Sequence, residues 1–179
     1  DNDGWNLVAE DLIGLLDKSN KKFPGLNQYV LSHSMGSWIA LAAMQKGMSV
    51  DGLILSGSSK PSKTILVIQK FLVKIQIFLF GKKSVSLFLE NITIGPYNNA
   101  FKPNRTLKDW ISSDNDNVDD YISDPLCGFP VTNGLWNDLA MGLLEVFDKN
   151  KYPKLNNLTP IFIISGSEDP VGENGKGVM

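Results

Sequence analysis

Ser32-His33-Ser34-Met35-Gly36 is the stretch that decides the fold of this chain. It follows an apolar, strand-like run at 29–31 and precedes a helix-like run at 38–44. A serine between a strand and a helix is typical of a nucleophile elbow, where the chain reverses at one strained residue and presents its hydroxyl at the edge of a sheet. Small residues are expected two positions to either side, because the strand and helix backbones approach there. Ser32 and Gly36 fill those positions.

A serine hydroxyl needs a base to take its proton, and that base is normally a histidine. The chain has one histidine, His33, directly beside Ser34. Because adjacent residues on a sharp turn point their side chains apart, we expect His33 to pack or cap near the elbow rather than to deprotonate Ser34. The chain therefore carries a nucleophile without its base. The backbone N–H of Met35, at the start of the elbow helix, is expected to donate to an oxyanion.

The composition is that of an ordinary, slightly acidic chain. Its 179 residues are 42% hydrophobic with a formal net charge of -2, which suits one domain with a real core. No basic patch indicates a nucleic-acid partner, and no Cys/His cluster indicates zinc, so we expect no metal and no cofactor. The single cysteine, Cys127, excludes an internal disulfide and favours a reducing, cytoplasmic compartment. Both ends read as cuts through a larger domain, and the oligomeric state is left open.

Alternating helical and apolar segments predict an α/β core. Apolar residues at helical spacing predict a helix from an Asp3 N-cap to Lys22, and the helix after the elbow is expected at 36–46. Continuous apolar runs between such helices favour a mostly parallel sheet with helices on both faces. The strands are expected at 28–32, 52–56 and 161–164, the last two of them buried.

Residues 60–150 break this rhythm, because they contain helix-like and loop-like sequence but no clear buried strand. An insertion of that size between two strands is expected to form a mainly helical cap over the sheet edge, where substrates bind in open α/β folds. The predicted core is then 1–59 and 151–179.

The apolar stretch 64–80 within this insertion could be taken for a membrane-spanning helix. It is near the lower length limit for one, and Gln69, Lys70, Lys74 and Gln76 interrupt it. We therefore expect a lid or packed helix, with transient contact to a membrane surface as the alternative.

Asp169 is the candidate acid of the site. It lies on the loop just after the apolar run 161–164, and in the chain order Ser, Asp, His it is correctly placed downstream of Ser34. Its carboxylate would accept the far N–H of the base's imidazole and stabilise the imidazolium. A turn aspartate before Pro170 is the plainer interpretation, and Glu168 is the neighbouring alternative.

Two further loops resemble ligand-binding motifs but lack residues that those motifs require. The acidic run 114–120 has neither the glycine nor the distal glutamate of an EF-hand loop, so a solvated loop with a helix N-cap is expected. The glycine-rich run 172–177 has no Ser or Thr after its lysine, so it is not a phosphate loop.

Several motifs together resemble the α/β-hydrolase superfamily, and within it the branch of monoacylglycerol lipases, lysophospholipases and related carboxylesterases. They are the elbow 32–37, similar to that branch's Gly-His-Ser-Met-Gly-Ser; the insertion segment 124–129, Asp-Pro-Leu-Cys-Gly-Phe; the acid segment 165–172; and Arg105-Thr106 with Asp109-Trp110. The resemblance spans nearly the whole chain. It implies an α/β-hydrolase fold with a helical cap insertion, incomplete at both ends.

The resemblance also implies roles for individual residues: Ser34 as nucleophile, Asp169 as acid and the Met35 N–H as oxyanion donor. It implies that the catalytic histidine and a second oxyanion donor lie outside this chain, so we expect the chain by itself to be inactive. The expected function is a serine hydrolase that cleaves carboxylic esters, lipid-like ones such as a monoacylglycerol or lysophospholipid, through an acyl-enzyme. A non-catalytic binding protein of this fold, or a peptidase or thioesterase, is the alternative.

Overall fold

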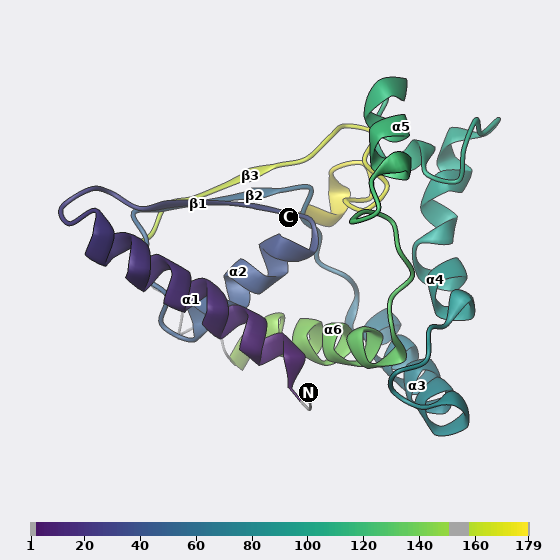
Figure 1. The fold of residues 1–179 in the computed structure, drawn as a ribbon, viewed down its shortest axis with the longest axis horizontal. Helices are drawn as coiled ribbons and strands as arrows, with labels where there is room; N and C mark the ends of the chain where they lie inside the picture. The colour runs from purple at the N-terminus through teal and green to yellow at the C-terminus, as the bar shows by residue number, and fades with distance from the viewer. Residues whose placement is uncertain (1–2, 151–157, 179) are drawn as a thin grey trace. The chain divides into compact units, whose positions relative to one another are not determined.

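The structure is a computed structural model that describes residues 3–150 and 158–178. It divides into two compact units (Figure 1). The core unit comprises Asp1–Ile68 and Asp138–Met179, and the insertion unit comprises Gln69–Asn137. The predicted boundaries of the cap, 60 and 150, enclose the insertion unit, and its role as a cap over the sheet edge stays a prediction. The first residues of the predicted segment 151–179 lie outside the described residues.

A parallel sheet forms the centre of the core unit. It has the order β1-β2-β3, with β1 at Tyr29–His33, β2 at Gly52–Ser56 and β3 at Ile161–Ile164. His33 pairs with Ser56 across β1 and β2, and Ser56 pairs with Ile164 across β2 and β3. Because all three strands run the same way, their carboxyl ends meet at one edge of the sheet, and the loops that follow them lie close together.

Helices α1 (Gly4–Lys22) and α2 (Met35–Gln45) lie on one side of this sheet (Figure 1). Their inward residues join β2 and the end of α6 (Asn133–Val146) in one apolar core. The most deeply buried members of this core combine three alanines with two large apolar side chains: Ala9, Ala40, Ala43, Met44 and Leu53. The prediction of an α/β fold with a parallel sheet is confirmed.

The predicted element boundaries hold to within about one residue. The strand before the elbow lies at Tyr29–His33 rather than 28–32, and the helix after it at Met35–Gln45 rather than 36–46. α1 ends at Lys22 as predicted. The predicted N-cap of α1 is wrong in its contacts, because the Asp3 carboxylate accepts from the Asn6 side-chain amide (2.8 Å) instead of from a backbone N–H.

Burial of the third strand differs from the prediction. All four side chains of β3 are exposed, and Phe162 is 62% exposed. The reason is that β3 is an edge strand among the described residues, and the alternate residues of β1 at the other edge, Tyr29 and Leu31, are similarly bare. A continuous apolar run therefore identified the strand correctly but not its burial in this chain.

The insertion unit is helical, as predicted. α3 (Lys63–Phe80) enters it, and α4 (Leu87–Thr93), α5 (Asn115–Ser123) and the short 3-10 helices η1 (Gly95–Phe101) and η2 (Asp109–Ile111) follow. A third short 3-10 helix, η4 (Lys176–Val178), lies near the end of the core unit. Within the described part of 60–150, extended pairing is limited to one antiparallel bridge, Val85 with Thr132.

Side-chain hydrogen bonds to backbone groups fix the loops of the insertion unit. The Asp109 carboxylate accepts from the backbone N–H of Arg105 (2.6 Å) and of Thr106 (3.0 Å), and from the Thr106 hydroxyl. The Thr106 hydroxyl is the main cause of a lowered pKa for Asp109. Asp114 accepts from the N–H of Asp116 (3.0 Å) at the start of α5, which confirms the N-cap predicted for the acidic run.

Candidate active site

Ser34 occupies a strained turn between β1 and α2. Its φ of 52° and ψ of -124° lie in a region that non-glycine residues rarely adopt, at a cost of about 1–3 kcal/mol. Its N–H donates to the carbonyl of Ser56 (2.9 Å), and its own carbonyl accepts from the N–H of Ser37 (2.9 Å). Ser34 is half-buried. The sharp strand-to-helix reversal predicted from the sequence is therefore present at this residue.

Met35 is the first residue of α2, and its side chain is 40% exposed. The first N–H groups of a helix have no partner within the helix, and they carry its partial positive charge. The N–H of Met35 is thus in the position that an oxyanion donor next to Ser34 requires.

The two small residues that flank the turn behave differently from each other. Ser32 is buried, and its hydroxyl donates to the carbonyl of Ile54 on β2 (3.0 Å), so a serine is accommodated in this strand position. At Gly36 a Cβ would meet no described atom within 4 Å. The expected close approach of backbones at Gly36 is therefore wrong for the described residues. Gly36 and Ser32 instead line a hollow of about 430 Å³ beside β1.

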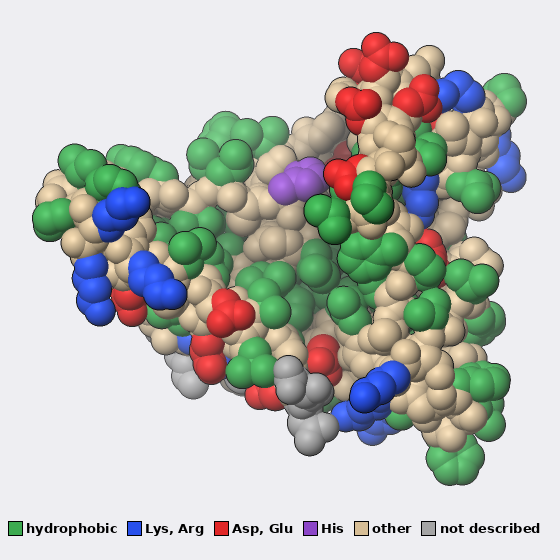
Figure 2. Space-filling model, in the orientation of Figure 1, with side chains coloured by type: hydrophobic (Ala, Val, Ile, Leu, Met, Phe, Trp, Pro, Cys, Tyr) green, Lys and Arg blue, Asp and Glu red, His purple; other side chains and the backbone are tan. Residues whose placement is uncertain are grey.

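The His33 imidazole contacts the end of β2 and the turn that follows it. Its Nδ1 lies 3.2 Å from the hydroxyl of Ser56, and a Cβ placed on Gly57 would lie 2.9 Å from its Cε1. The ring therefore lies over the turn that follows β2, and Figure 2 shows this single histidine as an exposed side chain. This position agrees with the expectation that His33 does not deprotonate Ser34.

Asp169 reaches the same turn from the loop after β3. Its Oδ1 accepts from the N–H of Val171 (2.9 Å), and its backbone carbonyl accepts from Asn174 (2.9 Å). Its Oδ2 lies 3.7 Å from the point that a Cβ on Gly57 would occupy. One carboxylate oxygen is thus held by the loop while the other faces the sheet edge on which Ser34 also lies, as a triad acid requires. The neighbouring Glu168 is exposed.

The loop after β2 belongs to this site and was not predicted from the sequence. Gly57 has a φ of +55° and separates His33 from Asp169. Ser56 accepts from Ser34, and Ser58 is buried against the start of α2. The sequence does show a run of small residues directly after β2. It does not show that β2 lies next to β1, the strand that leads into the elbow.

The Cys127 thiol is disfavoured as a nucleophile. Burial, followed by the negative charge of Asp124, raises the pKa of the Cys127 thiol. A raised pKa keeps a cysteine in the unreactive thiol form at neutral pH.

Known proteins are similar to this chain over most of its length. The family model described as "Serine aminopeptidase, S33" matches residues 1–178. The chain is 27% identical over 169 residues to the monoglyceride lipase of Homo sapiens, a match that covers 92% of this chain and 48% of that protein.

Solved structures show the same fold. A thermostable carboxyl esterase from Bacillus coagulans, in complex with glycerol, is 29% identical with a TM-score of 0.82, covering 94% of this chain and 55% of the esterase. A lipase in an open form is 22% identical with a TM-score of 0.84, covering 98% of this chain and 58% of the lipase, and supports the fold alone. The chain thus spans about half the length of the relatives that it matches.

Proposed function

The chain belongs to the serine aminopeptidase family of α/β-hydrolases, and from this premise we propose that the protein it comes from hydrolyses carboxylic esters through an acyl-enzyme on Ser34. The observation that carries the proposal is the strained, non-glycine turn at Ser34, with the Asp169 carboxylate on the same sheet edge. Strain of this kind persists only where the surrounding structure enforces it, and it is concentrated at functional sites.

In the proposed reaction the Ser34 oxygen attacks the ester carbonyl, and its proton passes to a histidine supplied by another part of the protein. Asp169 orients that histidine through Oδ2, and the Met35 N–H stabilises the oxyanion, a contribution of about 3 kcal/mol per donor in comparable sites. The alcohol leaves with the proton, and water then attacks the acyl-enzyme to release the acid.

The proposed substrate is a lipid-like ester such as a monoacylglycerol or lysophospholipid. The similarity to a monoglyceride lipase supports this class, and so do the exposed apolar side chains of the insertion unit, a region that the resemblance implies to be a cap.

Labelling of the full-length protein with a fluorophosphonate, followed by peptide mapping, tests the proposal. We expect one adduct, on Ser34, and its loss in Ser34→Ala. An adduct elsewhere, or none in the folded protein, would contradict it. A non-catalytic binding protein of the same fold would give no adduct. A peptidase or thioesterase would give the adduct on Ser34 but would cleave amide or thioester substrates faster than esters.

We propose in addition that the insertion unit touches an anionic membrane surface. The outer stripe of α3 carries exposed apolar residues at helical spacing, Phe71, Ile75 and Phe78, the last 88% exposed. One side of α3 is packed as expected, since Leu66 and Val73 are buried. Gln76 accepts from the Ser86 hydroxyl (3.2 Å), and the Phe71 and Phe78 side chains are left exposed. No described helix is long and apolar enough to cross a membrane, so the proposed contact is interfacial.

Charge favours an anionic partner for this face. Between Asp51 and Glu90 the chain has lysines but no Asp or Glu, although its formal net charge is -2. Lysines beside an exposed apolar stripe suit anionic headgroups, each adding about 1 kcal/mol near a charged surface.

In vesicle flotation we expect binding to vesicles with phosphatidylglycerol and little to pure phosphatidylcholine. Binding should fall in Phe71→Ser/Phe78→Ser but not in Leu107→Ser, a control at another exposed apolar residue; equal flotation of all three proteins would contradict the proposal.

The compartment remains a prediction. The single cysteine, Cys127, favours a reducing environment, and we propose a cytoplasmic location on that ground alone. Imaging of the full-length protein with a fluorescent tag at its carboxyl end tests it, and an extracellular or luminal signal would contradict it.

A further inference from the structure

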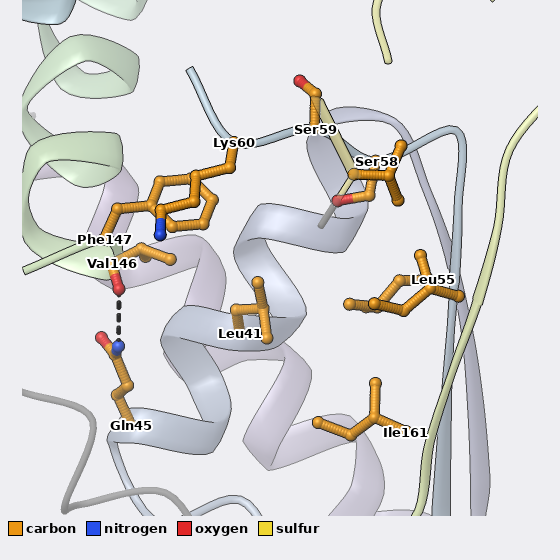
Figure 3. A pocket seen from close by; sticks show the side chains of 11 residues that line it. Leu41, Gln45, Leu55, Ser58, Ser59, Lys60, Val146, Phe147 and Ile161 are labelled. Carbon is orange, nitrogen blue, oxygen red and sulfur yellow. Dashed lines mark hydrogen bonds between the residues drawn. The ribbon is translucent and has the colours of Figure 1, made fainter. Parts of the chain in front are cut away.

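The end of β2 and the loop that follows it are attached to the elbow and to α2 by three hydrogen bonds. The carbonyl of Ser56 accepts from the N–H of Ser34 (2.9 Å). The Ser58 and Ser37 hydroxyl oxygens are 2.8 Å apart, and the carbonyl of Ser59 accepts from the indole of Trp38 (2.7 Å). All of these residues belong to the core unit. In Figure 3, Ser58 and Ser59 are seen at the end of a pocket of about 220 Å³ that Leu55 also lines.

Ser37 is the centre of this attachment. Its side chain is fully buried, and its hydroxyl lies 2.6 Å from the carbonyl of Ser34, which also accepts from the Ser37 N–H. A hydroxyl has one proton to donate. When the Ser37 hydroxyl donates to the Ser34 carbonyl, the Ser58 hydroxyl must be the donor to Ser37. The three residues then form a chain of hydrogen bonds from Ser58 through Ser37 to the Ser34 carbonyl, whose members strengthen one another in a buried setting.

This chain ends on a peptide unit that matters for the proposed chemistry. The carbonyl of Ser34 and the N–H of Met35 belong to the same planar peptide group. Any rotation of this peptide group that moves the carbonyl oxygen therefore moves the N–H as well, because it changes the ψ of Ser34 and the φ of Met35. Holding the carbonyl thus fixes the direction of the Met35 N–H relative to the Ser34 side chain, which is the alignment of oxyanion donor and nucleophile that the reaction needs.

We propose that Ser37 and Ser58 are positioning residues for Ser34 and for the Met35 N–H. They touch neither the substrate nor the reacting atoms, and they act through the Ser34 carbonyl. This inference rests on the proposed role of Ser34 as nucleophile. It assigns a function to two buried serines outside the triad, one of them on a loop that the sequence did not connect with the elbow.

Fluorophosphonate labelling of the full-length protein separates positioning from folding. The final amount of adduct counts folded, competent sites, whereas the rate constant reports how well each site is aligned. In Ser37→Ala and in Ser58→Ala we expect the rate constant per competent site to fall about 10-fold, less than the roughly 100-fold that follows loss of a whole oxyanion donor. Because both substitutions break one chain, the double variant should be little slower than Ser37→Ala.

Matched variants complete the test. Ser58→Thr keeps the hydroxyl and should label at nearly the wild-type rate constant. Ser19→Ala removes a partly buried hydroxyl that bonds Gln28 (2.6 Å) away from the elbow, and it should leave the rate constant unchanged. If wild type labels at Ser34 and both alanine variants label at the wild-type rate constant, the positioning role is overturned while the proposed function stands. If wild type does not label, the proposed function fails first. Should Ser37→Ala not fold, the Ser58→Ala and Ser58→Thr pair decides.

Discussion

Gly57 sits between His33 and Asp169 with a left-handed backbone, and both features require glycine. A Cβ there would lie 2.9 Å from the His33 ring and 3.7 Å from the Asp169 carboxylate. We expect Gly57→Ala to lose about 1–2 kcal/mol from the backbone alone, and to slow fluorophosphonate labelling because the displaced ring crowds the acid. Gly25→Ala is the control, since Gly25 has a φ of +80° but no described atom within 4 Å of its would-be Cβ. Urea unfolding should show similar backbone strain in both variants, and equal labelling rates would refute the crowding.

Asp109 makes the stability of the insertion unit depend on pH. Its pKa lies below the ordinary value of 3.8 for an aspartate, chiefly because the Thr106 hydroxyl donates to the carboxylate. A lowered pKa contributes stability that is complete above the unfolded value and is lost as the pH falls through the folded one. We therefore expect the free energy of unfolding of Asp109→Asn to lie below that of wild type at neutral pH, with the gap closing below pH 3.8. Urea titrations across this range measure it, and a gap independent of pH would show that the charge is unimportant.

At the scale of single residues, the sequence predicted the strained Ser34 but not Ser58, which lies near it in space. The local motif alone identifies Ser34, because a serine between a strand-like and a helix-like run has few alternatives to a sharp turn. No local motif identifies Ser58. It reaches the elbow only because β1 and β2 pair in a register that places His33 opposite Ser56, and strand register depends on long-range contacts that a local pattern does not contain.

At the scale of elements, α1 and α6 meet at a glycine. A Cβ on Gly142 would run into the ring of Trp5, which is 7% exposed. We expect Gly142→Ala to be destabilised by about 1–3 kcal/mol, as overpacked cores are. Gly14→Ala, in the middle of α1 with no described atom within 4 Å, should instead be stabilised by about 0.5–1 kcal/mol. Thermal and urea unfolding of the two variants compare these effects directly, and destabilisation of both to the same extent would contradict the steric argument.

For helix α3, the periodicity of apolar residues predicted the helix but not which of its faces is buried. Its apolar residues predicted a helix correctly, and Leu66 and Val73 are buried as a packed helix requires. The orientation was not predictable, because residues such as Phe71 and Phe78 are as apolar as the buried ones. In a helix with apolar residues on most of its circumference, the face that packs is chosen by neighbours elsewhere in the chain.

At the scale of the whole molecule, the sheet of the core unit carries an apolar face that the described residues leave bare. Tyr29, Leu31 and Phe162 are 66%, 70% and 62% exposed, and they lie on the two edge strands β1 and β3. Exposed edge strands with apolar side chains pair readily with other chains.

We therefore expect a polypeptide of residues 1–179 by itself to self-associate with rising concentration, as measured by sedimentation velocity. Leu31→Lys/Phe162→Lys should reduce that association, because each lysine places a charge on the face and the edges. Leu126→Lys, at an insertion-unit residue that is 80% exposed, is the matched control. Association that Leu126→Lys suppresses as strongly would place the contact outside the sheet, and a monomer at all concentrations would mean that this face is shielded in solution.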